Sequence, residues 1–481
     1  MKKTEKEIYS VLHNTFGADE FRPSQKEAIL RILEGKHSMI LMPTGMGKSL
    51  CYQLPALFFD GLTVVISPLI ALMKDQTDRL KELSIDASFV NSSLNKQERE
   101  NRYNNIKNGK YKILYVSPER FRKQAFLDVI QHRKISLLAL DEAHCVSQWG
   151  NDFRPDYSRI GEFRKIIGEP VTIALTATAT ANVQQDIIDK IGIPLNSIKI
   201  FNEGICRPNL FLEVFQVIDE EEKFNLIFEK IKQNDGVMII YFNLIKSIER
   251  LSEWLDLKKT RYTIYHGKLS PEKRKKIQSN FMNAQKSVML ATNAFGMGID
   301  KPDIRTIIHA EIPDSIESYY QEIGRGGRDG KKTECILFYD QNDLAVQISF
   351  LEWRNPDAVF IKNVYTLLKS LGENVNSFDY DDLQAKVVHK QRDDHRLQTV
   401  FNLFDMHGVT KGSIENKNLR LMAEIPNELQ EGEFIKLKMN SDRLRLIDMM
   451  NYSKSDECRR KIIYRYFGIE YKGCGNCDNC L

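Results

Sequence analysis

The sequence predicts an α/β fold with two parallel-sheet domains in tandem, followed by a mostly helical part and a small cysteine-rich module. Three observations predict it. Short apolar runs alternate with helical patterns from about residue 37 to 200, the alternation restarts near residue 236, and the strand signal fades after about residue 343. Strands that alternate with helices form doubly wound parallel sheets.

The two sheet domains are predicted over residues 1–204 and 205–342, with the polar stretch 202–209 as the linker. A parallel strand that is buried on both faces is a continuous apolar run, so such runs locate the strands. The strands expected in the first domain are 38–42, 62–67, 113–117, 135–140 and 171–175. Those expected in the second domain are 236–242, 261–265, 287–291, 306–310 and 334–339.

Beyond residue 343 the patterns are helical, and one segment is inserted into another. Residues 343–356 and 441–481 are expected to form one module, whose long helix 441–467 leads to the cysteines. The insertion, residues 357–440, contains helix candidates at 359–371, 380–388 and 397–407, followed by a glycine-rich turn and a short alternating run. Three helices and a hairpin are typical of a winged helix, but they also fit a helical spacer or a partner-docking bundle.

Size and charge set limits on the class of protein. The chain has 481 residues, too many for one core, and a formal net charge of +4 that neither demands nor excludes a nucleic-acid partner. No apolar run is long enough to span a bilayer, and the N-terminus has no apolar signal core. We therefore expect no membrane contact and a cytoplasmic location.

Four of the eight cysteines gather near the C-terminus and predict a metal site. Four thiolates at such a spacing form a tetrahedral structural zinc site, and an iron–sulfur cluster is the alternative. The remaining cysteines are scattered, as buried thiols of a reducing compartment would be. The predicted ligands are Cys458, Cys474, Cys477 and Cys480.

Residues 42–49 lie between a predicted strand and a helical pattern, and they predict a phosphate-binding loop. Backbone N–H groups of such a loop cradle the β-phosphate, its lysine reaches the β- and γ-phosphate oxygens, and its hydroxyl ligates Mg²⁺. The strict pattern has glycine where Met42 stands, so this is a shorter form of the loop. Its residues are Thr44, Gly45, Gly47, Lys48 and Ser49.

Asp141 and Glu142 follow the apolar run 135–140 and predict the other half of a nucleotide site. A carboxylate pair at the end of a strand suits Mg²⁺ binding and water activation. The residues that follow include side chains of the kind that stack on bases and bind phosphates, namely Trp149, Phe153, Arg154 and Tyr157. The alternatives are a surface acidic pair beside a solvated turn, and aromatic side chains packed in the core.

In order along the chain, seven segments resemble the motifs of superfamily 2 helicases: 21–25, 42–49, 67–76, 141–144, 176–178, 294–300 and 321–330. The run 145–150 resembles the aromatic-rich loop of the RecQ family. The resemblance covers about residues 16–353 and 441–481. It implies two RecA-like motor domains and a terminal zinc module.

For the nucleotide, the resemblance implies that Arg22 and Gln25 hold adenine. Gln25 would do so through a bidentate pair of hydrogen bonds from its side-chain amide. Lys48 and Ser49 would bind phosphate and Mg²⁺. The remaining roles implied are Mg²⁺ binding by Asp141, positioning of the attacking water by Glu142, and arginine fingers at Arg325 and Arg328, with Arg328 contacting the γ-phosphate.

For DNA, the resemblance implies that Trp149, Phe153 and Arg154 contact a single strand. Residues that would transmit domain closure are His144, Thr176, Thr178 and Gln321, although a lone histidine is ordinarily a satisfied core residue. The partners implied are single-stranded DNA and tailed or forked duplexes in the nucleoid. A protein bound through residues 357–440 is a further candidate partner.

The sequence departs from the RecQ pattern in four places. Ala18 stands where an aromatic side chain usually stacks on adenine, and residues 241–245 lack a small hydroxyl and an arginine expected after their strand. Residues 357–440 are inserted, and the chain ends at Leu481, directly after the last cysteine, a short form without the usual winged domain. We expect the insertion to replace that domain.

The function implied is that of an ATP-dependent DNA helicase that moves 3′ to 5′ on single-stranded DNA, hydrolyses Mg-ATP and unwinds duplexes in repair or recombination. One alternative is a DNA-stimulated ATPase that remodels or anneals DNA without efficient unwinding. The other is a non-catalytic nucleic-acid scaffold, which the presence of Lys48, Asp141, Glu142 and Arg328 disfavours.

Overall fold

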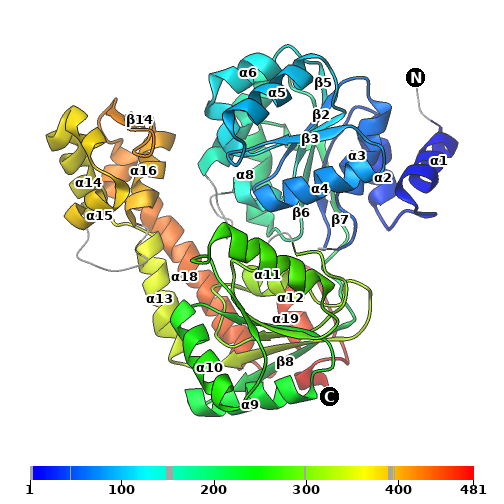
Figure 1. Cartoon of the computed structure of the whole chain (residues 1–481), viewed down its shortest axis with the longest axis vertical. Coiled ribbons are helices and arrows are strands. Elements are labelled where there is room, and N and C mark those ends of the chain that lie inside the picture. Colours follow the sequence, from blue (N-terminus) through cyan, green and yellow to red (C-terminus); the bar gives the residue numbers. More distant parts are fainter. Residues whose placement is uncertain (1–3, 44, 148–154, 297–298, 388–393, 395) are drawn as a thin grey trace. The chain divides into compact units, whose positions relative to one another are not determined.

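The computed structural model describes residues 4–43, 45–147, 155–296, 299–387, 394 and 396–481 (Figure 1). The chain divides into two compact units. The first contains Met1–Glu311, Glu317–Tyr339 and Lys454–Leu481, and the second contains Ile312–Ile316 and Asp340–Ser453. Among the residues that the structure describes, no helix combines the length and apolarity needed to cross a bilayer.

The first sheet is fully parallel, with strand order β3-β4-β2-β5-β6-β1-β7. Its strands are β1 (His37–Leu41), β2 (Leu62–Ile66), β3 (Ala87–Val90), β4 (Ile113–Val116), β5 (Ile135–Leu140), β6 (Val171–Thr176) and β7 (Ile198–Asn202). The helices are α1 (Glu5–Phe16), α2 (Gln25–Leu33), α3 (Leu50–Phe58), α4 (Ile70–Glu82), α5 (Lys96–Lys107), α6 (Gln124–Ile130), α7 (Ile160–Ile166) and α8 (Ala181–Ile191).

Alternate residues of a central strand enter different apolar clusters, so both faces of this sheet are covered. Met39 and Leu41 of β1 belong to one buried cluster, whereas Ile40 and Met42 belong to another. Successive side chains of a strand point to opposite faces, and a strand covered on both faces reads as one apolar run. This is the physical reason why the central strands could be located from the sequence.

The second sheet is also fully parallel, with strand order β10-β11-β9-β12-β13-β8. Its strands are β8 (Leu210–Gln216), β9 (Val237–Phe242), β10 (Thr263–Tyr265), β11 (Ser287–Thr292), β12 (Ile304–His309) and β13 (Thr333–Tyr339). The helices in this part of the chain are α9 (Glu220–Gln233), α10 (Ile245–Leu257), α11 (Pro271–Asn283) and α12 (Ile316–Ile323). The predicted fold class, two tandem parallel-sheet domains, is confirmed.

Three strands were missed by the sequence analysis, and all three lie at sheet edges. They are β3, β7 and β8. In β7, residues Lys199, Ile200 and Asn202 are exposed and only Ile198 and Phe201 are buried. An edge strand that is partly solvated lacks a continuous apolar run, so the criterion that found the central strands fails for it.

The second unit has a core of its own, built from helices and one small hairpin. Its elements are α13 (Asp343–Arg354), α14 (Ala358–Leu371), α15 (Tyr380–Val387), α16 (Arg396–Met406), β14 (Thr410–Lys411), β15 (Arg420–Leu421), α17 (Asn427–Glu431) and α18 (Glu433–Lys454). The strands β14 and β15 pair antiparallel. The core includes Val364, Leu383, Val400 and Phe404, contributed by three different helices.

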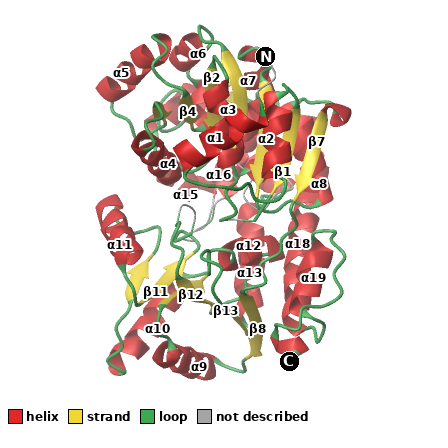
Figure 2. Cartoon of the chain, turned by 90° about the vertical axis from the view of Figure 1, so that its right-hand side faces the viewer, coloured by secondary structure: helices red, strands yellow, loops and turns green. Residues whose placement is uncertain are grey.

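The long helix expected over residues 441–467 is two helices. α18 ends at Lys454, and α19 (Arg459–Tyr466) begins after a break. In the break the Ser455 hydroxyl accepts a hydrogen bond from the backbone N–H of Glu457 at 3.0 Å. Serine side chains that bond nearby backbone groups compete with helix formation, which the periodicity of the apolar residues does not reveal. α19 packs on β8 of the second sheet (Figure 2).

Candidate nucleotide site and cysteine cluster

The phosphate loop lies between β1 and α3, as predicted, and its glycines are required by conformation and by space. Gly45 has φ +83° and Gly47 has φ +77°, in the left-handed region that side chains disfavour. A Cβ at Gly47 would lie 2.9 Å from Nε2 of Gln25. Thr44 lies outside the described residues.

Gln25 and Arg22 hold the phosphate loop from the start of α2. Nε2 of Gln25 donates to the carbonyl oxygens of Met46 and Gly47, both at 3.1 Å, and its Oε1 accepts from the backbone N–H of Arg22 at 2.9 Å. The Arg22 guanidinium donates to the Gly45 carbonyl at 2.8 Å. The side-chain amide of Gln25, which was expected to hold adenine, is thus hydrogen-bonded to the backbone of the phosphate loop.

Lys48, Asp141 and Glu142 come together at the carboxyl ends of β1 and β5. Nζ of Lys48 is 3.9 Å from Oε1 of Glu142, and these side chains are only 10% and 16% exposed. Oδ1 of Asp141 accepts from the backbone N–H of Glu142 at 3.1 Å. Glu142 has φ +48°, an unusual value for a residue with a side chain, and this conformation turns the chain at the site.

The surroundings of the two carboxyl groups shift their pKa values in opposite directions. Burial, together with the neighbouring Glu142 carboxylate, raises the pKa of Asp141 well above its usual range. Burial also acts to raise the pKa of Glu142, but Lys48 and then His144, Arg325 and Arg328 hold that pKa below its ordinary value. The site therefore keeps Glu142 ionised, whereas ionisation of Asp141 would be stabilised by a bound cation.

His144 joins the acidic pair to the end of β6. Its Nδ1 lies 3.0 Å from the Thr176 hydroxyl and 3.5 Å from Oε2 of Glu142. The Thr176 hydroxyl donates in turn to the carbonyl of Thr178 at 3.0 Å. Gln321 lies on α12, and its side chain makes no hydrogen bond to this network among the described residues.

Arg325 and Arg328 follow α12 and reach the same site. The Arg325 guanidinium donates to the carbonyl of Gly296, and that of Arg328 donates to Oδ1 of Asp300 at 2.6 Å. A Cβ at Gly45 would lie 3.2 Å from Cγ of Arg328, so this side chain lies against the phosphate loop.

Asp300 was not given a role from the sequence, although it belongs to one of the quoted motifs. Its Oδ2 accepts from Arg79 of α4 at 3.0 Å while its Oδ1 accepts from Arg328. An acidic residue at the end of a glycine-rich segment was the available signal, but only the fold shows which arginines it joins.

The predicted DNA-contacting residues Trp149, Phe153 and Arg154 lie outside the described residues. Tyr157, which was grouped with them, has no exposed surface and packs in the core of the first sheet domain. That part of the prediction was wrong. The neighbouring polar residues made the segment look exposed, but residues 155–159 form a short helical turn that carries Tyr157 inward.

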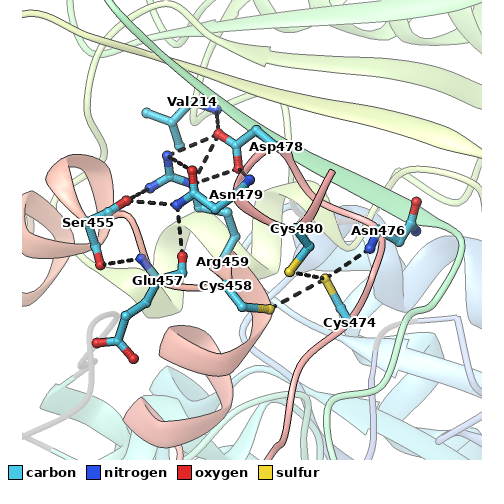
Figure 3. Close-up of polar contacts among 10 residues, drawn as sticks. All are labelled: Val214, Ser455, Glu457, Cys458, Arg459, Cys474, Asn476, Asp478, Asn479 and Cys480. Atoms are coloured by element: carbon cyan, nitrogen blue, oxygen red, sulfur yellow. Dashed lines mark hydrogen bonds and ion pairs between the residues drawn. The ribbon is translucent and has the colours of Figure 1, made fainter.

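The four C-terminal cysteines form one cluster, as predicted. Figure 3 shows three of them, Cys458, Cys474 and Cys480. Their sulfur atoms all lie within 4.8 Å of one another. Four thiolates bound tetrahedrally at the usual zinc–sulfur distance would be about 3.8 Å apart, so the donor set fits zinc. Hydrogen bonding from Cys477 lowers the pKa of Cys480 to about 7, whereas burial raises the pKa values of Cys474 and Cys477. The cluster comprises Cys458, Cys474, Cys477 and Cys480.

The cysteine loop is anchored to the second sheet. Leu212 of β8 forms an isolated bridge with Cys477, and the Asp478 carboxylate accepts from the backbone N–H of Val214 at 2.8 Å. The Arg459 guanidinium donates hydrogen bonds to the same carboxylate, with Nε 2.9 Å from Oδ1 (Figure 3).

Comparison with known proteins agrees with this architecture. Residues 22–187 match the DEAD/DEAH box helicase family, residues 222–330 match the helicase conserved C-terminal domain, and residues 421–481 match the RecQ zinc-binding family. A solved structure of *S. cerevisiae* Dbp5 bound to RNA and ADP BeF3 superposes with a TM-score of 0.56 at 18% identity, covering 72% of this chain and 92% of that chain. Two RecA-like domains with these sites define a helicase motor protein.

Two relatives place the chain within that class. The ATP-dependent DNA helicase RecQ of *Bacillus subtilis* is 45% identical over 346 residues, 71% of this chain and 58% of that protein. The probable ATP-dependent DNA helicase RecS of *Bacillus subtilis* is 35% identical over 479 residues, 98% of this chain and 92% of that protein. The chain belongs to the RecQ family of ATP-dependent DNA helicases. It spans little more than half the length of the RecQ relative but nearly all of RecS.

Proposed function

We propose that this chain is a DNA helicase that moves 3′ to 5′ on single-stranded DNA while hydrolysing Mg-ATP, in DNA repair or recombination. The observation that carries the proposal is the convergence of Lys48 and Glu142 from one sheet domain with Arg325 and Arg328 from the segment after α12. Fixed cations around the phosphates and an ionised carboxylate for the water are what phosphoryl transfer requires.

Each residue then has a stated task. Lys48 and the loop amides around Gly45 and Gly47 bind the phosphates. Glu142, held ionised by its cationic neighbours, orients the attacking water. Arg328 binds the γ-phosphate, with Arg325 beside it. Their positive charges then lie where negative charge develops in the transition state. Thr44 is proposed to bind the phosphates as well.

Asp141 and Ser49 are the residues that would hold Mg²⁺, and bound Mg²⁺ neutralises phosphate charge. The donor set fits, because the Asp141 carboxyl is buried beside the Glu142 carboxylate and its pKa is raised, so that a cation would stabilise its ionised form. Arg22 and Gln25 would bind adenine. For this, Gln25 must exchange its hydrogen bonds to the loop backbone for bonds to the base, a step that links adenine binding to loop conformation.

DNA binding and domain closure are proposed to communicate with this site. Trp149, Phe153 and Arg154 contact the single strand in the proposal, only a few residues beyond the acidic pair. The hydrogen bonds from His144 through Thr176 to Thr178 support a relay out of the site, with Gln321 acting from the second domain. DNA affinity should fall steeply with salt, because phosphate contacts dominate such binding.

The cysteine cluster is proposed to hold one structural Zn²⁺. The helices α14, α15 and α16 with the β14–β15 hairpin are proposed to act as a winged-helix-like unit that binds duplex DNA or a protein partner. In the loop between β14 and β15, which would be the wing of such a unit, Nζ of Lys417 donates to the carbonyl of Phe378 at 2.6 Å. This contact favours the second candidate function, a DNA-stimulated ATPase that remodels or anneals DNA without efficient unwinding.

The test has two steps. ATP hydrolysis is measured with and without single-stranded DNA, and strong stimulation is expected; absence of hydrolysis would overturn both candidate functions. Unwinding is then measured on duplexes with a 3′ tail, a 5′ tail or no tail. Unwinding of the 3′-tailed duplex alone supports the helicase, whereas stimulated hydrolysis without unwinding supports the second candidate.

A further inference from the structure

Arg207, at the start of the second sheet domain, is buried against the loop that carries Arg325 and Arg328. Its Nη1 donates to the carbonyl of Gly324 at 3.0 Å, and its Nη2 donates to those of Gly326 and Gly327, the latter at 3.1 Å. The side chain is 8% exposed, and burial lowers its pKa below the ordinary value for arginine. One buried guanidinium thus binds three backbone carbonyls of this short loop.

Asn209 binds the same loop from a second direction. Its Nδ2 donates to the carbonyl of Gly327 at 2.8 Å and to that of Lys331 at 2.9 Å. Gly327 has φ +52°, and a Cβ there would lie 2.5 Å from this Nδ2. Gly327 therefore allows the close approach of Asn209, which a side chain at this position would block.

The backbone that carries Arg207 is itself held by the zinc-binding part of the chain. Nη2 of Arg460 on α19 donates to the carbonyls of Arg207 at 3.1 Å, Pro208 at 3.0 Å and Leu210. Nδ2 of Asn476, within the cysteine loop, also donates to the Pro208 carbonyl, at 2.9 Å. Arg460 is only 6% exposed.

We propose that Arg207 is a positioning residue for the arginine loop 324–328, and that Arg460 couples the fold of the cysteine module to that loop. The inference rests on the proposed role of Arg325 and Arg328 in ATP hydrolysis. Only a planar fork of donors can bind several carbonyls in fixed directions, so lysine is a poor substitute at residue 207. The contacts set where Arg328 lies relative to the phosphates and leave the phosphate loop itself unchanged.

The test is a double-mutant cycle on the full chain, measured as kcat and KM for ATP with saturating single-stranded DNA. Arg207→Lys should lower kcat about tenfold or more and change affinity for a non-hydrolysable ATP analogue less than about threefold. In a chain that already carries Arg328→Ala, Arg207→Lys should lower kcat no further, because both substitutions remove the same action of Arg328 on the phosphates. Multiplying losses would show independent roles and overturn the proposal.

Two outcomes separate this inference from the proposed function. If Arg328→Ala keeps normal turnover, the proposed arginine finger is wrong and the inference falls with it. If Arg328→Ala lowers turnover while Arg207→Lys leaves kcat unchanged, the proposed function stands and the positioning role is wrong. Should Arg207→Lys fail to fold, Asn209→Ala tests the same loop and should give a smaller loss confined to kcat.

The coupling to the cysteine module is tested with two arginines of α19. Arg460→Ala should lower kcat while the zinc content, measured with a colorimetric chelator, stays that of the wild type. Arg465→Ala is the matched control, since its side chain is 59% exposed and contacts only Glu457 in the described structure. Normal kcat in Arg460→Ala, or loss of zinc together with kcat, would overturn the coupling.

Discussion

Nζ of Lys48 and Oε1 of Glu142 face each other at 3.9 Å, too far apart for a hydrogen bond. In the part of the chain that the structure describes, Nζ of Lys48 and Oε2 of Glu142 have no hydrogen-bond partner although both are buried. Unsatisfied buried polar atoms are costly, and they mark sites where a ligand completes the bonding. These unsatisfied atoms support the proposal that a phosphate and a water bind between Lys48 and Glu142.

Glu142→Gln is expected to abolish turnover and retain ATP binding. The amide keeps the shape of the side chain but cannot accept a proton from water, and loss of a general base lowers kcat by about 100-fold or more. ATP hydrolysis with DNA and binding of a fluorescent ATP analogue give the two readouts. Glu162→Gln, on an exposed side chain, is the control. Retained hydrolysis in Glu142→Gln would remove the assigned role.

Asp141→Asn is expected to stabilise the protein free of metal and nucleotide, while destroying activity. Burial raises the folded-state pKa of Asp141 to about 7, from an ordinary value of 3.8. Between these values the folded state binds more protons than the unfolded state, so this group makes stability fall as pH rises from about 4 to about 7. Above pH 7 the penalty is constant.

The variant should therefore melt at a higher temperature than the wild type at pH 8, by about 2 °C or more, and the difference should shrink as pH falls towards about 4. Melting is measured in EDTA, because Mg²⁺ would satisfy the carboxylate and hide the difference. Asp60→Asn, an exposed aspartate, should show no such pH-dependent gain. A lower melting temperature for Asp141→Asn at pH 8 would contradict the prediction.

The sequence predicts those features of the molecule that depend on neighbouring residues along the chain. The phosphate loop, the acidic pair and the four cysteines were predicted because each combines a short spacing with a strand or helix boundary. The central strands were found because both their faces are buried. Edge strands such as β7 were missed because solvation interrupts their apolar runs.

Contacts between distant segments could not be predicted. Arg207 lies in a stretch that reads only as a linker, and its partners Gly324 to Gly327 come more than 100 residues later. Asp300 likewise gains its meaning from Arg79 and Arg328, which the fold brings together. Tyr157 shows the opposite error, where polar neighbours suggested exposure and the backbone turned the ring into the core.

Gln25→Ala is expected to raise KM for ATP about thirtyfold, since two hydrogen bonds of about 1 kcal/mol each are lost. If Gln25 reads adenine, the preference for ATP over GTP should fall together with the affinity. Competition of the two nucleotides for a fluorescent analogue measures this. An equal loss for ATP and GTP would show that Gln25 acts only by holding the carbonyls of Met46 and Gly47.

Cys477→Ser is expected to release the metal and to lower the melting temperature. Cys477 is fully buried and its loop anchors to β8, so loss of the metal frees both the thiolates and the strand edge. Metal analysis of the wild type should give one zinc per chain without the visible absorption of an iron–sulfur cluster. Cys206→Ser, an exposed thiol outside the cluster, is the control and should retain zinc. A wild-type chain that contains iron, or a Cys477→Ser variant that keeps its zinc, would contradict the assigned site.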